Sequence, residues 1–185
     1  GKEFVFAMRD LMTQLDRANA AQEVTPISFV NVFRASFPAF AERMPNNGPW
    51  KQQDAQEFNK LLMEQLETIF KKATLQSVRE FIPNQFCGKI KYTMKCQGCS
   101  TESHRTENFY ELRVPIERGH DIEMCLGKIF AMEYFTDSNK YMCSVCKMKQ
   151  DAVRMTRIAQ APEILNLQLM RFVYVIMCHL LSIRL

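Results

Sequence analysis

Four of the seven cysteines stand in two C-x2-C pairs, and this pattern constrains the fold more than any other feature of the chain. Cys96 and Cys99 form the first pair, and Cys143 and Cys146 form the second. Two residues between ligands let a tight turn direct both sulfurs at one ion, and four thiolates are the ligand set of a closed structural zinc site. The sequence therefore predicts one tetrahedral zinc site built from two knuckles.

Disulfides or a redox dithiol are the alternatives for these four thiols. No segment is typical of a signal peptide, and in a reducing compartment a doubled C-x2-C favours metal binding. A redox motif belongs on a βαβ pattern, which neither pair has. We also expect Gly98 to supply a positive φ in the first knuckle. The other cysteines, Cys87, Cys125 and Cys178, lie in apolar stretches, where a lone Cys usually acts as a small hydrophobic residue.

The hydrophobic period changes from helical to two near residue 86. Apolar residues at helical spacing predict helices over about 4–15, from a Thr25 cap to residue 36, and from Asp54 onward. A further short helix is expected after Asp121. Alternating or apolar segments predict strands that look antiparallel, at 86–94, 110–116, 153–158 and 164–172. Helices that precede antiparallel strands indicate an α+β fold.

Composition and charge exclude several classes of function. The chain is 47% hydrophobic and 24% charged, which is typical of a soluble globular protein. Its net charge of +4 is spread among acidic residues, so we expect no nucleic-acid binding. The longest apolar run covers residues 172–181, about half of the roughly 20 residues that a spanning helix needs. We therefore expect no membrane association and an intracellular location.

The segment "QQDAQEF" at residues 52–58 is the second dense cluster of functional groups. In one interpretation Asp54 caps the helix and Glu57 completes a capping box, which is a purely structural role. In the other, Asp54, Gln56 and Glu57 grip a basic, extended peptide through charge-assisted hydrogen bonds. Local chemistry leaves both interpretations open.

Several segments together resemble the ubiquitin-specific proteases, a family of cysteine proteases. "QQDAQEF" resembles the box that lies between the Cys box and the fingers in that family. Four later segments resemble the fingers strands, the second knuckle and the strand that enters the palm: "FCGKIKYTMKCQGCSTES", "ENFYELRVPI", "NKYMCSVCKMKQDAVRMTRI" and "PEILNLQLMRFVY". The resemblance extends from about residue 5 to residue 174.

The resemblance implies a partial papain-like fold with four parts. These are thumb helices over 1–80, zinc-bearing β fingers over 81–160, a first palm strand over 161–174 and an aberrant tail over 175–185. It implies a thiol-dependent hydrolase that cleaves the isopeptide bond after the C-terminal glycine of ubiquitin, in the nucleus or cytoplasm. Its partners would be ubiquitin and ubiquitinated proteins. Asp54, with Gln56 and Glu57 nearby, would bind an arginine of the ubiquitin tail.

The sequence departs from the family pattern at the catalytic boxes. A Cys box is expected before residue 1 and a His box after the palm strand, and the chain shows neither; His179 matches no family box. We therefore assign no catalytic residue and expect the polypeptide as given to be inactive. The alternatives are a non-catalytic zinc-ribbon or ubiquitin-binding module and, with less support from the dispersed charge, a zinc-ribbon nucleic-acid binder.

Overall fold

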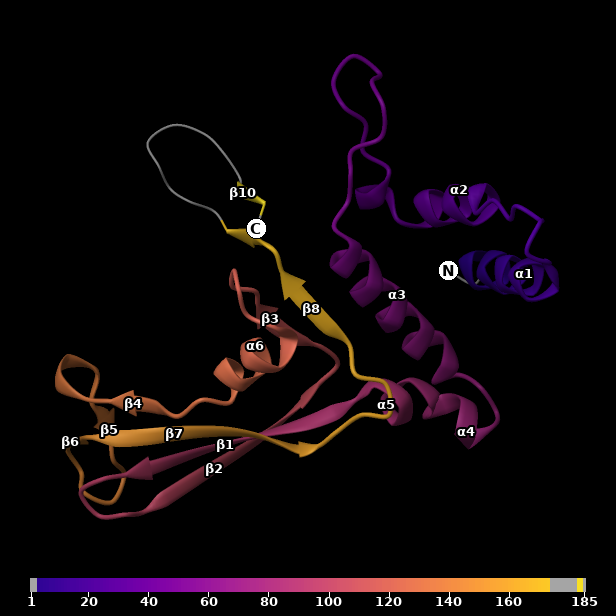
Figure 1. Ribbon diagram of the computed structural model, residues 1–185. Helices are drawn as coiled ribbons and strands as arrows, with labels where there is room; N and C mark the ends of the chain where they lie inside the picture. The colour runs from indigo at the N-terminus through magenta and orange to yellow at the C-terminus, as the bar shows by residue number, and fades with distance from the viewer. Residues whose placement is uncertain (1–2, 174–182, 185) are drawn as a thin grey trace. The chain divides into compact units, whose positions relative to one another are not determined.

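The computed structural model describes residues 3–173 and 183–184, and the chain divides into two compact units, Gly1–Phe81 and Ile82–Leu185 (Figure 1). The helices are α1 (Glu3–Arg17), α2 (Ile27–Ser36), η1 (Pro38–Phe40), α3 (Ala55–Phe70), α4 (Gln76–Arg79), α5 (Phe81–Phe86), α6 (Ile122–Ile129) and η2 (Asp137–Asn139). Among the helices in this part of the chain, none is long and apolar enough to span a membrane.

The core of the first unit is a cluster of phenylalanines. Phe4 is fully buried, and it packs with Phe29, Phe33 and Phe40. Phe33 lies at the centre of the cluster, and the centroid of its ring is 4.8–5.8 Å from those of four others, Phe29, Phe37, Phe40 and Phe58. These rings come from α2, η1 and α3 and from the residue that joins α2 to η1, so the aromatic contacts hold the helical elements together.

The second helix does not begin as predicted. Pro26 rather than Thr25 occupies the capping position of α2, and no side chain caps the helix. The carbonyl of Pro26 accepts the first helical hydrogen bond, from the amide of Val30 at 2.9 Å. The fixed φ of proline already suits the helix entrance, so the helix starts there without a hydroxyl cap.

The second unit is built around a four-stranded antiparallel sheet in the order β2-β1-β7-β4. Figure 1 shows β1, β2 and β7 as long neighbouring strands, with β5 and β6 near one end of β7. The strand bounds are β1 (Gly88–Cys96), β2 (Glu102–Phe109), β3 (Leu112–Pro115), β4 (Glu133–Phe135), β5 (Tyr141–Met142), β6 (Lys149–Gln150), β7 (Ala152–Gln160), β8 (Leu167–Met170), β9 (Phe172–Val173) and β10 (Ile183–Arg184).

One pair of strands contradicts the expectation of antiparallel pairing. β3 pairs with β8 in parallel, with Leu112 opposite Leu167. Parallel strands need a long crossover between them. Here the crossover contains α6, β4 and the strands from β5 to β7, which explains why local sequence patterns did not reveal the pairing. The helix α6 begins as predicted, because the Asp121 carboxylate accepts a hydrogen bond of 2.8 Å from the Met124 amide.

Candidate metal centre

Two β-hairpins place the four cysteines of the C-x2-C pairs. The turn between β1 and β2 carries Cys99, with Cys96 as the last residue of β1. The turn between β5 and β6 carries the second pair. Cys96 lies opposite Ala152 at the start of β7, and the Gln97 amide donates a 2.8 Å hydrogen bond to the Asp151 carbonyl. The pairing of β1 with β7 therefore brings the two hairpin turns to the same end of the sheet.

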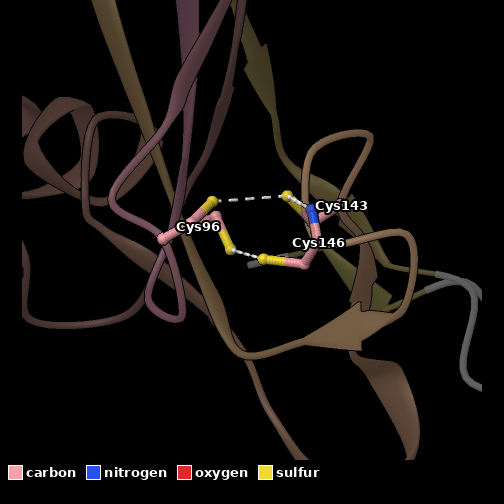
Figure 2. A group of neighbouring side chains, drawn as sticks. Cys96, Cys143 and Cys146 are labelled. Carbon is pink, nitrogen blue, oxygen red and sulfur yellow. Dashed lines mark hydrogen bonds between the residues drawn. The ribbon is translucent and has the colours of Figure 1, made fainter.

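The four sulfur atoms converge at the spacing of a metal site. All lie within 4.8 Å of one another, with Sγ–Sγ distances of 3.9 Å from Cys96 to Cys146 and 3.6 Å from Cys99 to Cys143. A tetrahedron with Zn–S bonds of about 2.3 Å has S···S edges of about 3.8 Å. A disulfide would need about 2.05 Å. Figure 2 shows the labelled Cys96, Cys143 and Cys146 side chains directed toward a common centre.

The two knuckles share one backbone conformation. In each, the residue after the second Cys has a positive φ, 60° at Ser100 and 57° at Lys147. In each knuckle, the backbone carbonyl of the first Cys accepts a hydrogen bond from the amide of this positive-φ residue. The amide of the first Cys donates a hydrogen bond to the carbonyl of the residue that follows the positive-φ residue. The four bonds are Ser100 to Cys96 (2.9 Å), Cys96 to Thr101 (3.0 Å), Lys147 to Cys143 (2.9 Å) and Cys143 to Met148 (3.1 Å).

The prediction that Gly98 supplies the positive φ of the first knuckle is therefore wrong. The positive φ falls one residue beyond each second cysteine, and Gly98 itself is not in the left-handed region. A Cβ added at Gly98 would lie 2.7 Å from Oε1 of Gln150. The glycine thus allows the Gln150 side chain, which follows the second knuckle, to approach the backbone of the first.

The pKa shifts of three of the thiols are consistent with a site for a cation. Hydrogen bonds with the hydroxyl and amide of Thr101 lower the pKa of Cys99 to about 6. The Cys146 amide lowers the pKa of Cys143. The hydrogen bond with Cys99 raises the pKa of Cys146 to about 12. The four thiols cannot all ionise near neutral pH by themselves, whereas a divalent cation at their centre would offset two of the four negative charges and favour the thiolate forms.

The Asp54 carboxylate caps α3, as one of the two interpretations predicts. Its Oδ1 atom accepts hydrogen bonds from the amides of Gln56 (2.7 Å) and Glu57 (3.1 Å). Within the described part of the chain, Oδ2 of Asp54 has no hydrogen-bond partner, and Glu57 makes no return bond to complete a capping box. Asp54 and Arg34 also border a mainly apolar cavity of about 400 Å³ between α2 and α3. The sequence pattern did not indicate that Arg34 lies near Asp54, because η1 and the segment of residues 41–53 separate the two residues along the chain.

The remaining cysteines and histidines form no catalytic pair among residues 3–173. Cys125 is fully buried, and the Cys87 thiol lies near the Gly88 carbonyl. Nδ1 of His104 is 3.1 Å from the Thr93 hydroxyl, and Nδ1 of His120 is 3.3 Å from Glu117. Two further residues considered from the sequence, Cys178 and His179, lie outside the described residues, as does most of the 175–185 tail.

Comparison with known proteins identifies the family. The family model described as ubiquitin carboxyl-terminal hydrolase matches residues 2–181. The chain belongs to this family. The recognition from sequence segments, and the mixed helix-and-sheet fold that it implied, are thereby confirmed.

Relatives within the ubiquitin carboxyl-terminal hydrolase family agree with this placement. Ubiquitin carboxyl-terminal hydrolase 48 of Gallus gallus is 40% identical over 124 residues, which cover 67% of this chain and 12% of the relative. Ubiquitin carboxyl-terminal hydrolase 26 of Oryza sativa subsp. japonica is 27% identical over 92% of this chain and 16% of its own length. Probable ubiquitin carboxyl-terminal hydrolase 9 of Schizosaccharomyces pombe is 30% identical over 81% of this chain. The chain spans between 12% and 25% of the length of these relatives.

Proposed function

We propose that this chain is the ubiquitin-holding part of a thiol-dependent deubiquitinase, which hydrolyses the isopeptide bond after the C-terminal glycine of ubiquitin. The observation that carries the proposal is the convergence of four thiols at metal-site spacing in a chain of the ubiquitin carboxyl-terminal hydrolase family. Ubiquitin and ubiquitinated proteins are its proposed partners. The nucleophile and its base would come from other parts of a longer protein.

The proposed metal is zinc, and its proposed role is structural. Cys96, Cys99, Cys143 and Cys146 supply four sulfur ligands, which complete a tetrahedral site and leave no position for a substrate. Bound zinc would offset part of the negative charge of the four thiolates and would hold the four sulfurs together. What the protein gains is a fixed orientation of the β1–β2 hairpin relative to the β5–β6 hairpin, at the end of a sheet that would contact the folded body of ubiquitin.

Asp54 is proposed to bind an arginine in the extended C-terminal tail of ubiquitin, with Gln56 and Glu57 beside it. The cap uses only Oδ1 of the carboxylate, so Oδ2 remains able to accept from a guanidinium. Asp54 is exposed at the helix start, where a peptide can reach it. One carboxylate can therefore cap α3 and bind the tail at the same time.

In the full-length enzyme, Asp54→Asn is expected to lower kcat/KM toward a ubiquitin substrate by roughly tenfold to a hundredfold, because a charge-assisted hydrogen bond is removed. The melting temperature should hardly change, since Asn caps a helix about as well as Asp. Steady-state kinetics with ubiquitin–amidomethylcoumarin measures the effect, and Glu64→Gln on the same helix is a matched control. An unchanged kcat/KM would restrict Asp54 to its capping role.

The chain by itself is expected not to react with a ubiquitin vinyl-sulfone probe, because no thiol within the described residues has an imidazole base. Mass spectrometry of the treated protein measures this. Covalent labelling of Cys87 or Cys125 would overturn the expectation. If the full-length protein is equally silent while still binding ubiquitin, the non-catalytic ubiquitin-binding module becomes the better proposal.

A further inference from the structure

Antiparallel pairing concentrates positive charge on one face of the four-stranded sheet. Lys89 and Lys91 alternate along β1 and therefore point to the same face. Arg157 on β7 lies directly opposite Lys91. We call these three residues the basic face. The sequence did not predict it, because Arg157 is distant from the two lysines along the chain and its neighbours there have mixed character.

The basic face has no internal neutralisation. Within the part of the chain that the structure describes, Lys89, Lys91 and Arg157 form no salt bridge. The β2 residues that pair with Lys89 and Lys91 are Asn108 and Thr106, and neither carries a charge. Glu102, an acid that the register places on this face, lies at the knuckle end and is 3.9 Å from both Lys95 and His104.

The opposite face of the same sheet behaves differently. Its two arginines are both paired: Arg105 with Glu107 along β2, and Arg154 with Glu133 across from β7 to β4. Both arginines of the opposite face are thus neutralised by acids, whereas the three cations of the basic face are not. Like charges directly opposite one another destabilise an antiparallel pair. The fold gains nothing from placing Lys91 against Arg157, so the arrangement points to a partner.

We infer that the basic face docks an extended acidic segment of a protein partner. Alternate residues of a strand are about 6.6–6.8 Å apart on one face, and alternate side chains of an extended peptide have the same separation. Carboxylates at every second residue of the partner thus have the spacing of Lys89 and Lys91. Arg157 adds a positive charge on the neighbouring strand, opposite Lys91. Thr106, Asn108 and Met155 lie beside the cations on this face, and none of the three offers a ring on which a nucleobase stacks. The rings that the register places on this face, His104 and Tyr134, lie farther toward the knuckle end.

Binding of two labelled peptides to the full chain, purified with zinc, tests the inference by fluorescence anisotropy. In one peptide Glu alternates with Ser; in the other the same residues stand in two blocks. We expect the alternating peptide to bind several-fold more tightly, and its affinity to fall between about 0.05 and 0.3 M NaCl because the charges are exposed. Equal affinity for both peptides, or no binding of either, would overturn the inference.

Two double variants provide the matched comparison. Lys91→Gln with Arg157→Gln removes two positive charges from the basic face and is expected to weaken binding by about tenfold. Arg105→Gln with Arg154→Gln removes two from the opposite face and should change the affinity by less than about twofold. Equal losses for both would show attraction by net charge alone and contradict the inference. Tighter binding of a single-stranded RNA than of the alternating peptide, reduced by the first double variant, would also contradict it.

Folding of the variants is checked independently. Arg157→Glu places an opposite charge across from Lys91, so its melting temperature should equal or exceed that of the parent chain while peptide binding is lost. Retained peptide binding in this folded variant would overturn the inference.

Discussion

Replacing Cys143 by Ser is expected to release the zinc and to open the end of the sheet that carries the two knuckles. The change removes a ligand that is only 2% exposed and leaves three thiols that repel one another once ionised. Structural zinc sites contribute apparent binding free energies of about 10–16 kcal/mol in zinc-finger peptides, so the loss of one ligand has a large effect. Metal analysis of the purified protein measures zinc, and hydrogen exchange measures opening of β5 and β6.

Cys87→Ser is the matched control for this experiment. Cys87 is partly buried and free, precedes β1 and does not belong to the four-thiol cluster. It should retain one equivalent of zinc and the same exchange protection at the knuckles. A Cys143→Ser protein that still carries a full equivalent of zinc would show that the cluster is not the metal site.

Phe33→Ala is expected to lower the free energy of unfolding of the helical unit by about 3–5 kcal/mol, the range typical of large-to-small aromatic changes in cores. Phe33 is 4% exposed and packs against four other rings, so its removal leaves a cavity in the core. Trp50 is the single tryptophan of the sequence and lies in this unit, so its fluorescence during urea denaturation reports the change.

Phe6→Ala distinguishes packing from the mere loss of a phenyl group. Phe6 lies on α1 and is 52% exposed, so its replacement should cost less than about 1 kcal/mol. Zinc content should be unchanged in both variants, because the cluster belongs to the other unit. Equal destabilisation by the two changes would contradict the central role assigned to Phe33.

The elements that the sequence predicted are those whose burial is one-sided. The stripe on α3 and the alternation in β1 both reflect one covered face, and the capping residues Asp54 and Asp121 mark helix starts by local hydrogen bonds. The strand β2 escaped prediction because its residues are mostly polar and mostly exposed, so no alternation marks it. The parallel pairing of β3 with β8 escaped because nothing local specifies a partner across a long crossover.

In the candidate metal site, too, the locally encoded features were predicted from the sequence and the others were not. Ligand spacing within a knuckle is local, so the sequence pointed to all four cysteines that the structure brings together. The residues that tune the site were not predicted. Thr101 stabilises the Cys99 thiolate, and the positive φ falls on Ser100 and Lys147, which carry no glycine-like signal. Whether Asp54 binds ubiquitin stays a prediction, since a cap and a tail contact require the same residue.

A zinc ion bound as proposed would join the two matched knuckles and cross-link distant parts of the chain. Each hairpin brings two sulfur ligands, so the ion would close the segment of residues 100–142 into a loop, as a disulfide does, without requiring an oxidising compartment. The entropy of closing a flexible loop grows only slowly, by about 0.6 kcal/mol for each doubling of its length. The turns that connect β2, β3, α6 and β4 can therefore lengthen or shorten during evolution, while the stability contributed by the cross-link changes little.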